Sequence, residues 1–186
     1  MKRIASLALL IATIITTCQA QVSLGEKVSN FTASDQDGSK WILKKQMKSS
    51  EYLVIYFYPV AFTGGCTKQA CAYRDQKAKL VKVKAQVVGI SGDSPETLDL
   101  FALEHQLNFT LLSDEDGEIA SLFGVPHKEG GTIQREIEGQ MLNLVRKTTI
   151  QRWTFILDSK GVLIYKDAEV NAAEDSSKVV EFLSSL

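Results

Sequence analysis

The stretch 53-LVIYFYPVAFTGGCTKQAC-71 decides the fold. It begins with a continuous apolar run, Leu53 to Tyr58, which is rich in branched and aromatic side chains and ends at Pro59. Such a run is typical of a strand that is buried on both faces in a parallel sheet. Beyond it, apolar residues share one face at helical spacing, namely Cys66, Ala70, Tyr73 and Leu80. The stretch therefore predicts a buried strand followed by a helix.

The rest of the chain continues this alternation of strands and helices. Further strands are predicted at 86–91, 110–112, 154–157 and 162–165, the last two as a hairpin around the turn 158–161. Helices are predicted at 95–106, with Ser94 as its N-cap, at 118–123 and at 172–183. The polar segment from His127 to Thr149 is expected to be a long loop, in part helical. This pattern predicts a single α/β domain in which helices flank a central mixed sheet.

The first twenty residues have the layout of a secretory signal peptide. Lys2 and Arg3 precede an apolar run from Ile4 to Ile15, and small residues follow up to Ala20. A membrane span needs roughly 18 apolar residues, and this run is shorter. We expect cleavage after Ala20 and an exported domain, periplasmic or secreted, at 21–186. Two alternatives are a retained anchor and lipidation of Cys18.

Composition limits the partners of the mature domain. Without residues 1–20 the chain keeps 19 basic and 22 acidic residues, a formal charge of −3. A small negative charge without a basic block excludes nucleic acid as an expected partner. We also expect no membrane association after cleavage.

Two of the three cysteines, Cys66 and Cys71, lie in the motif CTKQAC. Their spacing differs from the C-x-x-C of disulfide oxidoreductases and from common zinc ligand pairs. A disulfide across so small a loop would stabilise the fold little, which argues against a structural pair. Cys66 falls in the first turn of the predicted helix, where free N–H groups and the helix dipole favour a thiolate.

An intact helix keeps the two sulfurs apart. Five residues of helix separate them by roughly 7.5 Å along the axis and about 140° around it. A disulfide needs Cα atoms within about 7 Å and converging side chains. Bond formation therefore requires the first turns to unwind, which the flexible pair Gly64-Gly65 permits.

The motif Pro59-x-x-x-Thr63-x-x-Cys66, with a second cysteine at 71, resembles the Q-type branch of the peroxiredoxins, also called bacterioferritin-comigratory proteins. The likeness extends from Val22 to Tyr165. It implies a thioredoxin-like fold and a thiol peroxidase that needs no cofactor. By this resemblance, Cys66 is the peroxidatic thiolate and Cys71 the resolving cysteine.

The resemblance also implies roles for three neighbours of the thiolate. Thr63 would hydrogen-bond the thiolate and the peroxide, Arg152 would hold the thiolate and polarise the peroxide, and Pro59 would shield the pocket. The long segment before Arg152 leaves Arg146 as a competitor for that role. This chain also departs from the usual pattern at Gly64, where proline is frequent, and at Gln69, where glutamate is common.

The predicted activity is reduction of hydrogen peroxide and small organic hydroperoxides, with turnover supported by a thioredoxin-like dithiol reductant. Because both cysteines are in one chain, a monomer is expected to complete the cycle. Two other functions remain open, a thioredoxin-fold disulfide oxidoreductase and a redox sensor. His105 and His127 lie far from the cysteines in sequence, and no metal site is expected.

Overall fold

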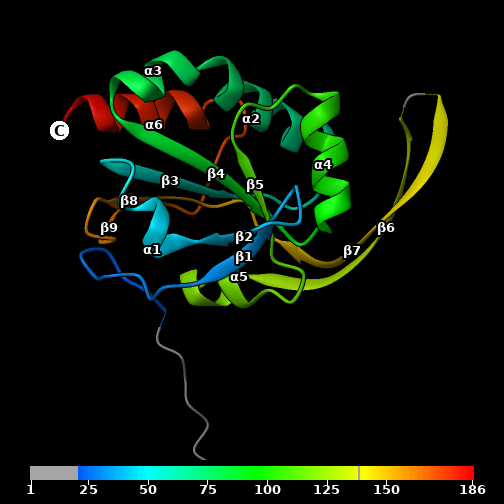
Figure 1. Ribbon diagram of the computed structural model, residues 1–186, viewed down its shortest axis with the longest axis horizontal. Coiled ribbons are helices and arrows are strands. Elements are labelled where there is room, and N and C mark those ends of the chain that lie inside the picture. Colours follow the sequence, from blue (N-terminus) through cyan, green and yellow to red (C-terminus); the bar gives the residue numbers. More distant parts are fainter. Residues whose placement is uncertain (1–20, 138) are drawn as a thin grey trace, which may run out of the picture.

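A computed structural model describes residues 21–137 and 139–186 (Figure 1). Its main feature is a seven-stranded mixed sheet with the strand order β2-β1-β5-β4-β3-β8-β9. The strands of this sheet are β1 (Thr32–Asp35), β2 (Lys40–Ile42), β3 (Tyr52–Phe57), β4 (Ala85–Ser91), β5 (Thr110–Ser113), β8 (Thr154–Asp158) and β9 (Leu163–Asp167). The pairs β3–β4 and β4–β5 are parallel, and the other pairs are antiparallel. The predicted mixed sheet is therefore confirmed.

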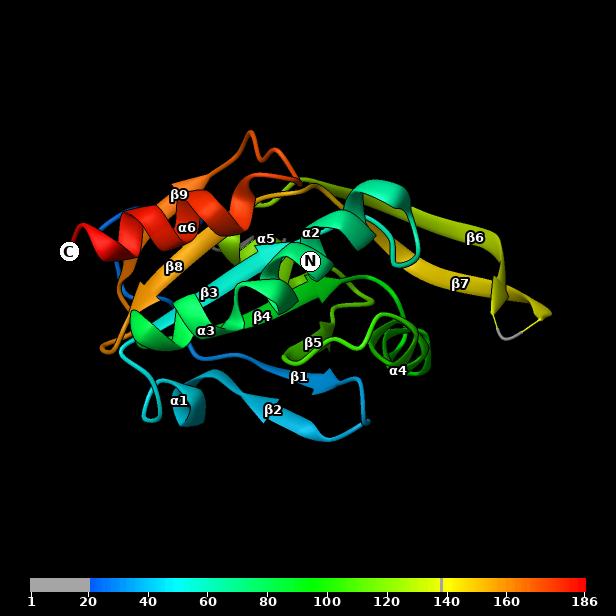
Figure 2. The ribbon, with the colours of Figure 1, turned by 90° about the horizontal axis from the view of Figure 1, so that it is seen from above.

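Helices cover both faces of this sheet (Figures 1 and 2). One face carries α2 (Gly64–Asp75), α3 (Lys77–Lys82), α4 (Pro95–Glu104) and α6 (Asp175–Ser184). The other face carries α1 (Leu43–Gln46) and α5 (Glu118–Phe123). Strand β3 lies between the two layers, and its residues from Leu53 to Phe57 are completely buried. This burial is the reason for its continuous apolar run.

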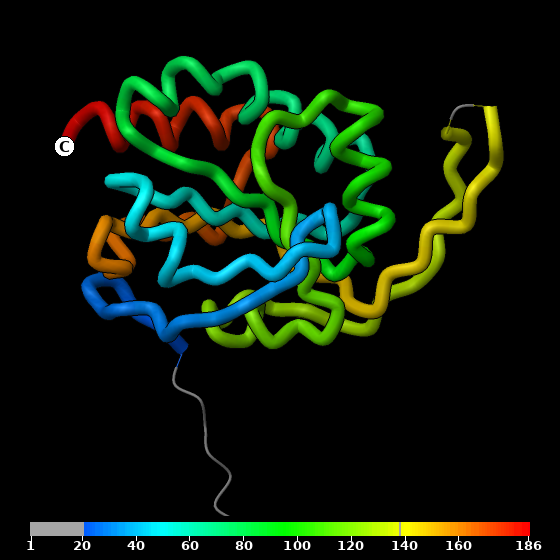
Figure 3. Tube along the Cα trace, in the orientation of Figure 1, coloured from blue at the N-terminus to red at the C-terminus, as the bar shows by residue number. Residues whose placement is uncertain are grey.

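The segment predicted as a long loop is instead a β-hairpin, and that prediction is wrong. Strands β6 (His127–Ile137) and β7 (Gln140–Ile150) pair antiparallel along nearly their whole length. The hairpin extends away from the main sheet, as the tube view shows clearly (Figure 3). Most of its side chains are at least partly exposed, so its composition is polar although its backbone hydrogen bonds are those of a sheet.

Two smaller differences concern the helix after β3 and the N-terminal elements. The helix after β3 is interrupted at Gln76, where α2 ends and α3 begins at Lys77. The first two strands and α1 were not predicted. Helix α4 starts as expected, because Ser94 accepts a hydrogen bond from the Thr97 N–H and Pro95 occupies the first turn. Within the described residues, no helix is long and apolar enough to cross a membrane.

Candidate active site

The candidate site lies where β3 ends and α2 begins. Thr63 occupies the N-cap position with extended backbone angles, and Gly64, Gly65 and Cys66 form the first turn of the helix. The N–H groups of a first turn have no partner within the helix. The Cys66 side chain is 1% exposed, so its sulfur is enclosed close to these donors.

Arg152 lies directly against the sulfur. It comes from the short segment between β7 and β8, and its Nη2 donates to Cys66 Sγ at 3.3 Å. Gly65 leaves room for this approach, since a Cβ at that position would lie 3.3 Å from Arg152 Nη2, which is tighter than an ordinary contact. The competitor Arg146 points elsewhere and donates to Thr149 Oγ1 at 2.9 Å. The structure therefore places Arg152, and not Arg146, at Cys66.

A chain of buried side chains continues from Arg152. Its Nη1 donates to Gln69 Oε1, and Gln69 Nε2 donates in turn to Asp175 Oδ2 at 2.6 Å. Tyr73 and Thr154 donate to the same carboxylate oxygen at 2.7 and 2.9 Å. Burial raises the pKa of Asp175, and the hydrogen bonds from Tyr73, Gln69 and Thr154 act in the opposite direction.

The sequence reasoning missed Asp175. One signal was available on α2 itself, because Gln69, Tyr73 and Gln76 follow one another at helical spacing. These residues face the start of α6, where Gln76 Nε2 contacts the hydroxyl groups of Ser176 and Ser177. A glutamine on the buried face of α2, beside Cys66, Ala70 and Tyr73, indicates a polar partner for that face but does not identify it.

The loop between β3 and α2 is held from two directions. The Ala61 N–H donates to Asp93 Oδ2 at 2.9 Å from the end of β4, and burial raises the pKa of Asp93. Arg135 of the hairpin donates from Nε to the Phe62 carbonyl at 3.0 Å. Phe62 itself has φ of 62°, a left-handed conformation that is uncommon for a side chain of this size. These contacts fix the loop that carries Pro59 and Thr63.

Three predicted site residues have positions but no tested role. The Thr63 hydroxyl donates to the Val60 carbonyl at 2.9 Å in this state. Pro59 is partly buried at the end of β3. Cys71 is a free, half-buried thiol on the same intact helix as Cys66, which is also free. The catalytic roles of these three residues, like those of Cys66 and Arg152, stay predictions.

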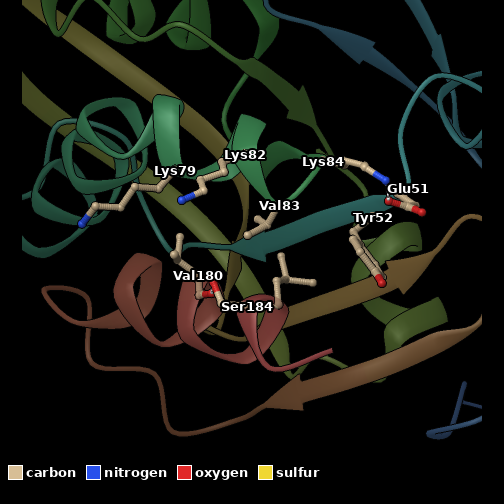
Figure 4. A pocket seen from close by; sticks show the side chains of 9 residues that line it. Glu51, Tyr52, Lys79, Lys82, Val83, Lys84, Val180 and Ser184 are labelled. Atoms are coloured by element: carbon tan, nitrogen blue, oxygen red, sulfur yellow. Dashed lines mark hydrogen bonds and ion pairs between the residues drawn. The ribbon is translucent and has the colours of Figure 1, made fainter.

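A pocket at the opposite end of β3 is lined by three lysines, Lys79, Lys82 and Lys84, and by apolar residues that follow α3 or belong to α6 (Figure 4). Its lining includes Tyr52, the first residue of β3, whereas Cys66 follows the end of that strand. A strand of six residues spans roughly 20 Å. The pocket is therefore separate from the cysteine site.

Comparison with known proteins gives the family. The AhpC/TSA family matches residues 24–166. The chain is 42% identical over 153 residues to the chloroplastic peroxiredoxin Q of Populus jackii, covering 81% of this chain and 63% of that protein. It is 41% identical over 145 residues to that of Triticum aestivum, covering 78% and 58%. The chain thus spans about three fifths of the length of these relatives.

Solved structures agree with the fold. The peroxidoxin BcpB of Mycobacterium tuberculosis superposes with a TM-score of 0.73 at 29% identity, covering 89% of this chain and 99% of that chain. The bacterioferritin comigratory protein of Xanthomonas campestris gives a TM-score of 0.67 at 25% identity, covering 83% and 90%. The predicted thioredoxin-like fold is confirmed.

The predicted export is contradicted by these relatives. The poplar and wheat proteins are both named chloroplastic, which points to an organelle and not to the periplasm or the exterior. The prediction relied on residues 1–20, which lie outside the described residues. A basic start followed by an apolar run is a feature of composition, and composition alone did not identify the compartment. Cleavage after Ala20 and lipidation of Cys18 were not tested.

The sequence motif, the arginine against a buried cysteine at a helix start and the match over residues 24–166 agree with one another. The chain therefore belongs to the AhpC/TSA family, among the Q-type peroxiredoxins.

Proposed function

We propose that this protein is a thiol-dependent peroxidase in which Cys66 is oxidised by the peroxide and Cys71 resolves the product. The observation that carries the proposal is the position of Arg152, whose Nη2 is 3.3 Å from the buried Cys66 sulfur at the start of α2. Among the relatives, the Xanthomonas protein is described by its alkyl peroxide reduction activity. We extend the substrate class to hydrogen peroxide and small organic hydroperoxides.

In the first step the Cys66 thiolate attacks one peroxide oxygen. An S–O bond forms and the O–O bond breaks, which leaves Cys66 as a sulfenic acid and releases the other oxygen as hydroxide or alkoxide, which takes up a proton. Negative charge moves from sulfur to the leaving oxygen during this step. Fixed donors along that line, namely Arg152 and the first-turn N–H groups, stabilise the transition state more than the ground state.

In the second step the Cys71 thiol attacks the sulfenic sulfur. The S–S bond forms and water leaves, with the thiol supplying one proton. Because α2 is continuous from Gly64 to Asp75, its first turns must unwind before the two sulfurs meet. An external dithiol of the thioredoxin type then reduces the disulfide and is itself oxidised. Because the pair is intramolecular, we expect the monomer to be active.

A single oxidation experiment tests this proposal. The reduced protein receives one equivalent of hydrogen peroxide and is examined at once by intact mass and tryptic mapping. Lys68 lies between the two cysteines, so trypsin separates their peptides unless a disulfide holds them together. We expect the loss of two hydrogens and linked Cys66 and Cys71 peptides.

Two variants identify the step that fails. Cys66→Ser is expected to leave the peroxide unconsumed, and Cys71→Ser is expected to consume one equivalent and stop at the sulfenic acid. Unchanged thiols in the wild type, with the peroxide still present, would refute the peroxidase. Thiol exchange with protein substrates but no peroxide turnover would instead support a disulfide oxidoreductase, and one oxidation without repeated turnover a redox sensor.

A further inference from the structure

The first residue of α6, Asp175, is a buried carboxylate that no part of the cysteine motif includes. It is 1% exposed, and one of its oxygens receives hydrogen bonds from Gln69, Tyr73 and Thr154. A buried carboxylate is costly unless such partners compensate it. The other oxygen, Oδ1, is buried without a partner among the described residues. Asp175 is connected to Arg152 by two hydrogen bonds through Gln69. A buried carboxylate in this position indicates a role in the site as well as in packing.

The key group between Asp175 and the reacting sulfur is the amide of Gln69. An amide has a donor end and an acceptor end. Its Nε2 is bound to Asp175 Oδ2 at 2.6 Å, so Oε1 is directed to Arg152 Nη1. The guanidinium is planar, and fixing Nη1 also fixes the direction of Nη2 toward Cys66 Sγ. If the amide turned over, its NH2 would meet the guanidinium donor to donor.

We propose that Asp175 is a positioning residue for the reaction of Cys66, because it orients the Gln69 amide, which in turn holds Arg152 against the sulfur. The expected effect of Asp175 on peroxide turnover rests on the proposed function. The expected effect on the reactivity of the Cys66 thiol does not, because alkylation measures it without peroxide.

The arrangement also explains why position 69 carries glutamine in this chain. A glutamate there would place its carboxylate next to Asp175 Oδ2, where Gln69 Nε2 now lies at 2.6 Å. Two negative charges at such a distance repel each other strongly in a buried site. Glutamine keeps an acceptor for Arg152 and supplies a donor for Asp175. Gln69 and Asp175 are therefore a matched pair.

The charge of Asp175 and its hydrogen bond predict opposite effects on Cys66. Removing a nearby negative charge makes a thiolate easier to form, whereas releasing Arg152 makes it harder. Other ionisable groups that interact electrostatically with Asp175 are Tyr56 on β3, Tyr73 on α2, and Asp167 and Tyr165 on β9. All of them remain in the variants that separate the two effects.

Two substitutions at this position separate charge from hydrogen bonding. Asp175→Asn removes the charge but keeps one acceptor oxygen for Gln69, whereas Asp175→Leu removes both and introduces a larger apolar side chain with the same branching. The assay is the rate of alkylation of the Cys66 tryptic peptide by iodoacetamide between pH 4 and 10, followed by mass. Steady-state peroxidase kinetics with hydrogen peroxide accompany it. Tyr73→Phe serves as a control, because it removes a donor to Asp175 without touching Gln69.

For Asp175→Leu we expect the midpoint of the alkylation profile to rise by about one pH unit and kcat/KM to fall about tenfold, as loss of a charged hydrogen bond implies. For Asp175→Asn and Tyr73→Phe the midpoint should not rise. An equal shift in both Asp175 variants, an equal rise in Tyr73→Phe, or no shift in any variant would overturn the proposal.

If Asp175→Leu does not fold, Gln69→Met tests the proposal in its place. This substitution removes the amide that links Asp175 to Arg152. A raised midpoint in that variant supports the proposal, and an unchanged midpoint overturns it. A wild-type protein without peroxide turnover, in which Asp175→Leu still raises the midpoint and Asp175→Asn does not, would refute the peroxidase while supporting the positioning role.

Discussion

Gly64 and Gly65 offer a matched pair of substitutions that separates helix stability from chemistry. A Cβ on Gly64 would meet nothing within 4 Å, whereas a Cβ on Gly65 would lie 3.3 Å from Arg152 Nη2. Neither glycine has a left-handed backbone, so the backbone conformation at both positions accepts alanine. Alanine is the better helix former by up to about 1 kcal/mol, which corresponds to about 2–4 °C in Tm for a domain of this size.

Only Gly65→Ala should impair the reaction with peroxide. The guanidinium must shift by a few tenths of an ångström, and the nitrogen that moves is the one bound to Cys66 Sγ. A hydrogen bond to a charged group contributes about 1.5–3 kcal/mol, so losing half of it would lower kcat/KM about fivefold. Gly64→Ala should keep kcat/KM for peroxide near that of the wild type.

The assay pairs initial rates over a range of hydrogen peroxide concentrations with thermal unfolding of the same preparations. We expect both variants to be at least as stable as the wild type, with only Gly65→Ala slower. Equal kcat/KM in the two variants would show that the approach of Arg152 over Gly65 does not limit the reaction. A lower Tm in Gly65→Ala would show that the added methyl group disturbs the fold.

Three further predictions use other parts of the site. Arg152→Lys keeps the charge but cannot donate to two acceptors in a fixed plane, so kcat/KM for peroxide should fall at least about tenfold. The control Arg146→Lys should keep kcat/KM within about twofold of the wild type, and equal values for the two variants in peroxide assays would contradict this reasoning. Arg135→Met removes the donor to the loop before α2, and the loop amides should exchange faster with deuterium; unchanged exchange by mass spectrometry would argue against a clamp. Burial lowers the pKa of His105, so the unfolded state binds its proton first, and stability should fall as pH drops below about 6.5. In urea unfolding, His105→Gln should lose less stability between pH 7.5 and 5 than the wild type, and an equal loss would exclude His105 as the cause.

The strands and helices that could be predicted are those whose side chains carry the pattern. Leu53 to Tyr58 lies between two helical layers, so burial appears directly in its composition, and β3 occupies Tyr52–Phe57. The predicted helix from Glu118 to Phe123 matches α5. The β6–β7 hairpin is largely held by backbone hydrogen bonds between exposed residues, and such bonds leave little trace in a sequence.

The site residues also fall into those that the sequence predicted and those that it did not. Cys66 and Arg152 were recognisable because their neighbours in sequence resemble a family motif, and the structure brings the two side chains together. Asp175 and Arg135 act on α2 and its loop from distant segments, one at the start of α6 and the other on the hairpin. Nothing local marks a carboxylate as buried or an arginine as a clamp. Gln69 on the buried face of α2 indicates that a polar partner exists, but only the tertiary arrangement identifies Asp175 as that partner and Arg135 as a clamp.

Oxidation of Cys66 should itself loosen the first turn of α2. In the proposed reaction the reduced sulfur reacts as a thiolate, and Arg152 and the helix start would then both attract its charge and help to keep the turn folded. A sulfenic acid is largely neutral, so the attraction of the sulfur's charge to the Arg152 guanidinium and to the helix start is lost, although Arg152 itself stays charged. The later part of the helix keeps its contacts, because Tyr73 remains bound to Asp175. The first turn can then unwind toward Cys71 while the rest of α2 stays docked on α6. Hydrogen exchange of Cys71→Ser, reduced and after one equivalent of peroxide, should show faster exchange confined to the first turns. Equal exchange in the two states would mean that unwinding does not depend on the charge of the sulfur.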